Sequence, residues 1–242
     1  MTGIYKIADR VVLIDSLFGG IHNMCLDYEF DGKPEISIKI STEDIDRERN
    51  ISSKESSSAY PDWYLETLAV YRRLSGKLLE YDTFLFHGSA IELDGESYLF
   101  TAVSGTGKST HTRLWRELYG DRAVMINDDK PLIKVENGRA IVYGTPWDGK
   151  HRLSTNKSSP LKAVCILERG LENKIFPISR DAAFATLFTQ TYRPDDGQQM
   201  AKTLELVDKL SRWVELYRLE CNMDIEAARV SYEGMKKGGK GE

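Results

Sequence analysis

The sequence predicts an α/β protein with a mixed, largely antiparallel sheet fed by a β-hairpin and flanked by helices. Three observations support this fold class. Extended and helical patterns alternate along most of the 242-residue chain. Two dipeptides that favour tight hairpin turns, Asp94-Gly95 and Asn137-Gly138, each lie between apolar segments. A glycine-rich loop at 102–109 joins an apolar strand to an amphipathic helix.

Residues 1–60 are expected to form a β-rich segment that packs on the main domain. Weak strand patterns occur at Arg10–Leu17, Met24–Glu29 and Glu35–Ile40, between glycine-rich or charged breaks. These residues hold too few apolar side chains for a core of their own. The serine-rich stretch 52–58 is the most linker-like part of the chain.

The main domain is expected at 61–235, followed by a tail at 236–242. Its helices are recognised by apolar residues at steps of three and four, and its strands by apolar runs between turn residues. The expected helices are Pro61–Leu78, Thr110–Tyr119, Asp181–Thr191, Gln198–Leu210 and Asp224–Met235. The expected strands are Phe84–Leu93, Ser97–Ala102, Ala123–Asp129, Leu132–Val135, Ala140–Tyr143, Lys162–Glu168 and Trp213–Cys221.

Composition excludes several classes of function. With 41% hydrophobic residues, 29% charged residues and a net charge of −4, the chain has no basic surface for nucleic acid. No apolar run reaches the roughly 18 residues of a membrane helix, so no membrane partner is expected. Cys25, Cys165 and Cys221 are far apart and odd in number, which indicates reduced thiols that fill the core of a cytoplasmic protein.

The loop before the helix is a Walker A sequence, which predicts binding of a nucleoside triphosphate. Glycines at 105 and 107 let backbone N–H groups turn inward, and the following helix directs its positive end at the phosphates. Lys108 is expected to reach the β- and γ-phosphates, and Ser109 to bind Mg²⁺. Ala102 occupies the position where the usual pattern has glycine. The residues expected to bind nucleotide are Ser104, Gly105, Thr106, Gly107, Lys108, Ser109 and Thr110.

Two adjacent acids, Asp128 and Asp129, end the apolar strand that follows the helix. In nucleotide-binding folds the next strand lies beside the first, so these acids are expected to face the phosphates. One carboxylate is expected to hold Mg²⁺, directly or through water, and the other is expected to accept a proton from an attacking hydroxyl, as a catalytic aspartate does in kinases. The alternative is a pair of solvated acids in a turn.

His87-Gly88-Ser89, the hairpin, the loop and the two acids together resemble the catalytic domain of HPr kinase/phosphorylase. The resemblance covers about Tyr81 to Asp148 and extends more loosely to about residue 230. That enzyme and phosphoenolpyruvate carboxykinase share a P-loop fold in which an antiparallel hairpin strand feeds the loop. The chain is similar to small bacterial proteins grouped with those two enzymes.

The resemblance implies roles for individual residues. It implies that Lys108 and Ser109 bind phosphate and Mg²⁺, and that Asp129 is the proton acceptor, with Asp128 near the metal. His87 matches an active-site histidine of the family; the alternative is a histidine packed near the end of the sheet. Relatives form higher oligomers, so a homo-oligomer is a further expectation.

The chain also departs from the family. Thr110 stands where the bifunctional enzyme has glutamate, and the downstream glycine-rich signature with its arginine is missing. The segment Gly144–Arg152 occupies that region instead. Its Lys150 and Arg152 could hold a phosphate or carboxylate of the acceptor; the alternative is a structural turn with the basic residues in water. These departures argue against HPr kinase/phosphorylase activity, and the length of the chain argues against carboxylation.

The leading hypothesis is an ATP- and Mg²⁺-dependent kinase that acts on a hydroxyl of an acceptor, which is a small molecule, a peptide or a protein. The alternative is a nucleotide-binding module without transfer chemistry, which would serve as a regulator or scaffold in a peptide-modification pathway. The second acid favours the kinase, since a module that only binds nucleotide needs one acid for its metal. The order of elements argues against a motor- or switch-type NTPase.

Overall fold

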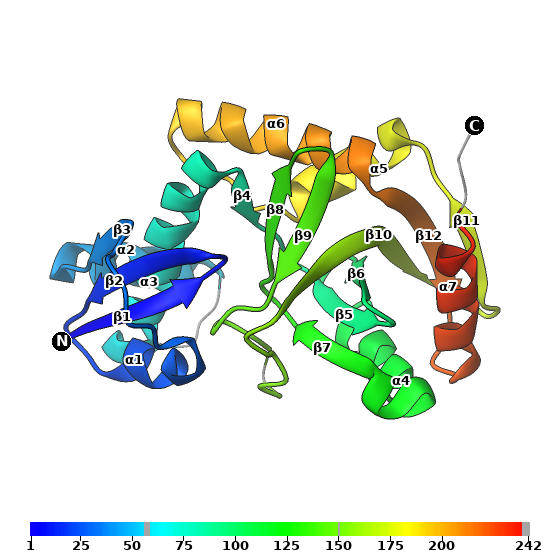
Figure 1. Ribbon diagram of the computed structural model, residues 1–242, viewed down its shortest axis with the longest axis horizontal. Helices are drawn as coiled ribbons and strands as arrows, with labels where there is room; N and C mark the ends of the chain where they lie inside the picture. Colours follow the sequence, from blue (N-terminus) through cyan, green and yellow to red (C-terminus); the bar gives the residue numbers. More distant parts are fainter. Residues whose placement is uncertain (56–58, 150, 239–242) are drawn as a thin grey trace. The chain divides into compact units, whose positions relative to one another are not determined.

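The computed structural model describes residues 1–55, 59–149 and 151–238, and the chain divides into two compact units, Met1–Glu80 and Tyr81–Glu242 (Figure 1). The boundary lies later than the one expected after residue 60. Helix α3 (Asp62–Leu78) packs against α1, α2 and β3 of the first unit, and it therefore belongs with the N-terminal residues. That helix supplies the apolar residues that the first sixty residues lack.

The first unit contains a sheet in the order β1-β2-β3, with bounds Thr2–Ile7, Arg10–Asp15 and Ile36–Lys39. The strands β1 and β2 are antiparallel, and β3 runs parallel to β2. The expected strand at Met24–Glu29 is wrong, because α1 (Gly20–Met24) and a 3₁₀ turn (Leu26–Tyr28) occupy that region. Ile21, Cys25 and Tyr28 are all buried, and their spacing of four and three residues is helical.

Helices α2 (Thr42–Glu55) and α3 complete the first unit. Residues 52–55 of the linker-like stretch continue α2, and residues 56–58 lie outside the described residues. The fully buried carboxylate of Glu66 on α3 accepts hydrogen bonds from the backbone N–H groups of Leu17 (2.5 Å) and Phe18 (3.0 Å). A buried charge needs such partners, so this contact ties α3 to the segment after β2.

The second unit contains a mixed sheet in the order β4-β8-β9-β10-β6-β5-β7, to which β12 adds beside β10 and β11 beside β12. β10 is parallel to β6 and to β12, and the other pairs are antiparallel. The mixed sheet confirms the expected α/β class. The strands are β4 (Thr83–Leu85), β5 (Ser89–Leu93), β6 (Glu96–Thr101), β7 (Ala123–Asn127), β8 (Leu132–Glu136), β9 (Arg139–Tyr143), β10 (Ser158–Arg169), β11 (Lys174–Pro177) and β12 (Glu215–Cys221).

Both expected hairpin turns are confirmed. Asp94 and Gly95 have φ of 57° and 85° between β5 and β6, and Asn137 and Gly138 have φ of 52° and 76° between β8 and β9. Positive φ at both central residues is the conformation that matches the twist of a two-residue hairpin. These turns therefore set the register of β5 on β6 and of β8 on β9.

Helices flank the sheet, as the sequence predicts (Figure 1). They are α4 (Lys108–Tyr119), α5 (Arg180–Thr189), α6 (Gly197–Trp213) and α7 (Glu226–Lys236). The core beneath α4 and α7 is aromatic: the ring of Trp115 lies 5.1 Å from that of Tyr98 and 5.5 Å from that of Tyr232. Of the expected tail, residues 239–242 lie outside the described residues.

Four strands of the second unit end at the same edge of its sheet. β6, β10 and β12 are parallel, and β7 runs in the same direction as β6 because both are antiparallel to β5. The expectation that β7 lies directly beside β6 is wrong, since the hairpin partner β5 lies between them. The carboxyl ends of all four strands nevertheless meet at one edge, where ligands bind in α/β folds.

Among the described residues, no helix combines the length and the apolar character that a bilayer span requires. All three cysteines are free thiols; Cys25 and Cys165 are buried, and Cys221 is half-buried. Burial raises the pKa of Cys25 to about 12, so this thiol is a protonated core group at neutral pH.

Candidate functional site

The glycine-rich loop connects β6 to α4 at this sheet edge. Gly105 and Gly107 have φ of 79° and 124°, a region that L-residues with side chains avoid. A Cβ at Gly105 would meet nothing within 4 Å, so backbone conformation rather than space demands glycine there. The N–H and the Oγ1 of Thr106 both donate to the carbonyl of Val103, at 3.1 and 2.8 Å. The loop is therefore a tight turn.

Helix α4 begins directly after the loop, at Lys108, with Gly107 as its N-cap. No side chain in the described part of the chain caps this terminus by a hydrogen bond. The first N–H groups of a helix lack intrahelical partners and carry a partial positive charge. The start of α4 therefore offers donors to an anion, which fits the phosphates of a nucleotide.

Lys108 lies half-buried between the loop and the acids. Its Nζ is 3.4 Å from the carbonyl oxygen of Ala102. Burial lowers the pKa of Lys108, while the charges of Asp129 and Asp128 act to raise it. The ammonium group thus lies within electrostatic range of both carboxylates.

Asp128 is held by side chains from β5 and α4. The residue is 6% exposed, and its carboxylate accepts a hydrogen bond of 2.6 Å from the Oγ of Ser89. The Oγ of Ser89 lies 3.0 Å from the Oγ1 of Thr112 on α4. A Cβ at Gly149 would lie 2.8 Å from the carbonyl oxygen of Asp128 and 3.2 Å from its Oδ2, so only glycine fits beside it. Asp128 is therefore a fixed group and not a solvated turn residue.

The buried side chain of Asn127 shapes the turn after β7. Its Oδ1 accepts from the backbone N–H groups of Asp129 (2.9 Å) and Lys130 (2.6 Å). Its Nδ2 donates to the Oγ1 of Thr145 (3.0 Å) and to the carbonyl of Trp147 (3.2 Å). This Asx-type turn sets the direction of both acids.

Asp129 lies between two basic side chains. Its Oδ1 is 3.4 Å from the Nε2 of His87, and its Oδ2 is 3.5 Å from the Nζ of Lys130. Burial acts to raise the pKa of Asp129, but the hydrogen bond from His87 and the charges of Lys130 and His87 lower it overall. Asp129 is therefore ionised at neutral pH.

In the described residues, no three His, Cys, Asp or Glu side chains converge as a metal site. A metal at this edge would need hydroxyl and phosphate oxygens beside a carboxylate. Mg²⁺ is bound in that way in nucleotide sites, through one or two carboxylates, water and phosphate oxygens. The exposed hydroxyl of Ser109 and the carboxylate of Asp128 are oxygen donors of the required kind.

The segment Gly144–Arg152 supports the turn after β7. Trp147 is 3% exposed and fills the core, and the Oγ1 of Thr145 donates to the carbonyl of Lys130 (2.9 Å). Burial raises the pKa of Asp148. Lys150 lies outside the described residues, and Arg152 is exposed with φ of 48°. Contact of either basic residue with an acceptor stays a prediction.

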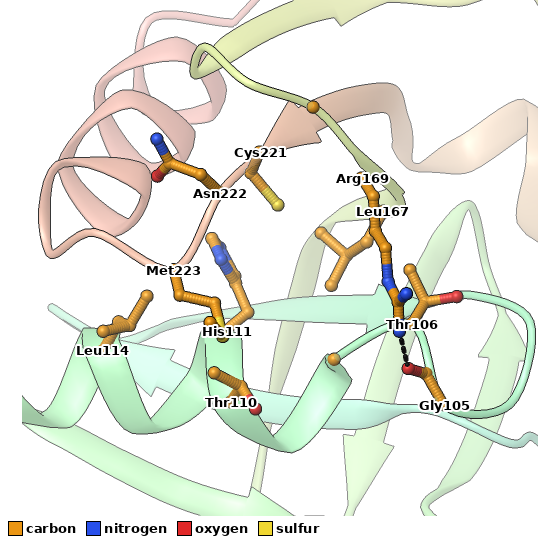
Figure 2. A pocket seen from close by; sticks show the side chains of 12 residues that line it. Gly105, Thr106, Thr110, His111, Leu114, Leu167, Arg169, Cys221, Asn222 and Met223 are labelled. Carbon is orange, nitrogen blue, oxygen red and sulfur yellow. Dashed lines mark hydrogen bonds between the residues drawn. The ribbon is translucent and has the colours of Figure 1, made fainter.

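Arg169 is a site residue that sequence reasoning missed. It ends β10, and its Nη2 donates to the carbonyl oxygen of Gly105 at 2.7 Å (Figure 2). The contact joins the end of β10 to the loop across 64 residues of sequence. The available signal was a basic residue directly after the apolar strand pattern Lys162–Glu168.

A cavity of about 470 Å³ lies beside the loop and was also missed (Figure 2). Its walls come from the loop, from α4 and from the carboxyl ends of β10 and β12. No sequence pattern marks it, because its walls come from segments far apart in the chain. The residues that line it include Gly107, His111, Leu114, Leu167, Arg169 and Met223.

The structure thus brings most of the expected site residues to one sheet edge. His87 contacts Asp129, the charges of Asp128 and Asp129 act on Lys108, and Ser109 and Thr110 occupy the first turn of α4.

Comparisons with known proteins place this arrangement in context. A comparison with curated protein sequences found no match. Among solved structures, the chain is similar to the Hpr(Ser) kinase/phosphatase from Coxiella burnetii, with 10% sequence identity and a TM-score of 0.34. That match covers 63% of this chain and 97% of the other. Residues 63–224, about two thirds of the chain, match the family described as SynChlorMet cassette protein ScmC. The chain belongs to the ScmC family.

Proposed function

We propose that this chain binds ATP with Mg²⁺ at the loop 102–109 and transfers the terminal phosphoryl group to a hydroxyl of an acceptor. One observation carries the proposal: Lys108 begins helix α4 directly after the glycine-rich loop, and the charges of Asp128 and Asp129 act on its ammonium group. A cation beside an open helix terminus and two carboxylates combines phosphate, metal and proton-acceptor chemistry at one sheet edge.

The phosphates are held by the loop and by the start of α4. Backbone N–H groups of the loop and of the first helical turn donate to phosphate oxygens, and Lys108 neutralises charge on the β- and γ-phosphates. Arg169 holds the loop in place through the carbonyl of Gly105. Phosphoryl transfer depends mainly on positioning and charge neutralisation, so a rigid cradle contributes directly to the rate.

Ser109 and Asp128 would hold the metal. Bound Mg²⁺ supplies charge neutralisation for the β- and γ-phosphate oxygens. The hydrogen bond from Ser89 fixes the Oδ1 of Asp128 and aligns the carboxylate before the metal arrives.

Asp129 would accept the proton of the acceptor hydroxyl. It is ionised at neutral pH because His87 and Lys130 lower its pKa against the effect of burial. His87 is 38% exposed and lies beside Oδ1, so it orients the carboxylate and gives the proton a path toward water.

The family description points to a class of acceptor. Its description calls the members cassette proteins, so we propose that the acceptor is another product of the same cassette. Arg152 is exposed and available for an acidic group of that acceptor.

The test compares Asp129→Asn with wild type in ATP binding and in acceptor-dependent formation of ADP. Asp129→Asn keeps the shape of the side chain but not the proton acceptor, so we expect transfer to fall at least about a hundredfold with ATP affinity nearly unchanged. The exposed Asp121→Asn serves as the matched control. Equal loss of binding and transfer would assign Asp129 a structural role. Tight ATP binding by wild type without transfer to any cassette product would favour a regulatory or scaffold module.

A further inference from the structure

The cavity beside the loop is formed by α4, which begins at the sheet edge, and by β10 and β12, which end there (Figure 2). α4 contributes Thr110, His111 and Leu114, and β10 contributes Leu167 and Arg169. Cys221, Asn222 and Met223, at and after the end of β12, complete the wall. The volume of about 470 Å³ lies in the range of small-molecule sites.

Part of this wall is the phosphate loop itself. Gly105, Thr106 and Gly107 line the cavity, and Thr110 lies on the first turn of α4. A molecule in the cavity would therefore lie directly against the groups proposed to bind phosphate. The occupant of the cavity and the polyphosphate at the loop can therefore be two parts of one covalently bonded ligand.

The wall is apolar and largely uncharged. Leu114, Leu167 and Met223 offer apolar surface, and the side chain of Met223 reaches toward His111 (Figure 2). The imidazole of His111 is buried in this wall. Such a wall suits a flat, neutral group better than a second phosphate, since burying an unpaired charge is costly.

Two polar groups accompany the apolar wall. His111 is 2% exposed, and its Nδ1 has no hydrogen-bond partner among the described residues, whereas its Nε2 lies 3.0 Å from the Oγ of Ser231. The guanidinium group of Arg169 lines the cavity while its Nη2 is held by Gly105. A guanidinium plane can stack on an aromatic ring and contribute affinity without a hydrogen bond to the ring edge.

We propose that this cavity takes the nucleoside part, base and ribose, of the nucleotide whose phosphates bind at the loop. The inference rests on the proposed nucleotide binding and adds the location and chemistry of the base site. The base packs on Leu114, Leu167 and Met223 and stacks against Arg169. The chain consequently distinguishes a nucleotide from a bare polyphosphate.

The test compares the Mg²⁺ complexes of ATP and inorganic tripolyphosphate by calorimetry with the full chain. Both ligands reach the loop, and only ATP reaches the cavity. We expect wild type to bind ATP at least about tenfold more tightly than tripolyphosphate. Met223→Ala removes apolar contact at a position that is 78% exposed, so the fold is not at risk, and we expect ATP affinity to fall about fivefold. Cys221→Phe fills the cavity and should reduce the preference for ATP further.

The readout is the ratio of the ATP affinity to the tripolyphosphate affinity. A general disturbance of the loop lowers both affinities and therefore leaves their ratio unchanged. Leu171→Ala is the matched control: Leu171 is 97% exposed, near the end of β10, and does not line the cavity. Equal affinity of wild type for the two ligands, or an unchanged ratio in both cavity variants, would overturn the nucleoside site. Failure of wild type to bind either ligand would instead contradict the proposed function.

Discussion

The Nε2 of His87 lies 3.4 Å from the Oδ1 of Asp129, and the two residues lie at the ends of different strands. His87 precedes β5 and Asp129 follows β7, and these strands pair antiparallel, so their adjoining ends meet at the loop edge. The backbone N–H of Gly88 also donates to the carbonyl of Asp129 at 3.1 Å. The contact is therefore fixed by backbone as well as by side chains.

Replacing His87 by alanine should raise the pKa of Asp129. Burial acts to raise that pKa, and the hydrogen bond from His87 is the first of the interactions that lower it. A depressed folded-state pKa stabilises the protein above the unfolded value of about 3.9, and this stabilisation is lost as pH falls through the folded pKa. We expect acid unfolding of His87→Ala to begin at higher pH. NMR titration of the Asp129 carboxyl measures the shift, with the other aspartates as internal controls; an unchanged pKa would contradict the contact.

Ser89→Ala should destabilise the second unit. It removes the 2.6 Å hydrogen bond to the buried carboxylate of Asp128, and bonds to charged groups contribute about 1.5–3 kcal/mol. Ser97→Ala is the matched control, since Ser97 is fully buried and its Oγ has no partner among the described residues. Urea unfolding should show a clear loss for Ser89→Ala and little change for Ser97→Ala. Similar losses in the two variants would argue against the role of Ser89.

Gly149→Ala should displace Asp128. The added Cβ would lie 2.8 Å from the carbonyl oxygen of Asp128, and overpacking of this kind costs about 1–3 kcal/mol. Gly197→Ala introduces the same methyl group where nothing lies within 4 Å, so it is expected to be neutral or stabilising. The free energy of unfolding and the Mg²⁺ dependence of ATP binding both report the difference. If Gly149→Ala changed neither the free energy of unfolding nor the Mg²⁺ dependence, the result would contradict a tight fit of Gly149 against Asp128.

Arg169→Ala should weaken the binding of both ATP and tripolyphosphate, and of ATP more, because the proposed stacking of the base on Arg169 is lost as well. Loss of the 2.7 Å bond to the carbonyl of Gly105 loosens the loop that both ligands use. One hydrogen bond from a charged donor corresponds to about a tenfold change in affinity. Arg139→Ala, an exposed arginine at the start of β9, is the control. If calorimetry found both affinities unchanged in Arg169→Ala, the result would contradict a role of Arg169 in holding the loop.

The sequence predicts much of this fold because its signals are local. The turn dipeptides Asp94-Gly95 and Asn137-Gly138 require positive φ, and the glycines of the loop follow the same rule. The alternation of strands and helices in the second unit is equally readable, since burial imposes a period on each element. The strand expected at Met24–Glu29 fails because its apolar residues fit both periods over so short a stretch, and burial of Ile21 decides for a helical turn.

Contacts between distant segments could not be predicted in the same way. Arg169 meets Gly105 only because β10 lies beside β6, and that pairing joins residues about sixty positions apart. The cavity depends on the end of β12 lying beside the end of β10. The insertion of β5 between β6 and β7 follows from the antiparallel hairpin, yet no local pattern shows which strand pairs with its outer edge.

Calorimetric titration of Mg²⁺–ATP into wild type and Lys108→Ala tests the central claim most directly. The ammonium group neutralises phosphate charge at the open start of α4, so we expect wild type to bind and Lys108→Ala to lose at least about tenfold in affinity. The variant should remain folded, because Lys108 is half-buried and the hydrogen bond from its Nζ to the carbonyl of Ala102 is long, at 3.4 Å. Absence of heat with wild type, or equal affinity of the two proteins, would contradict a phosphate site at this loop.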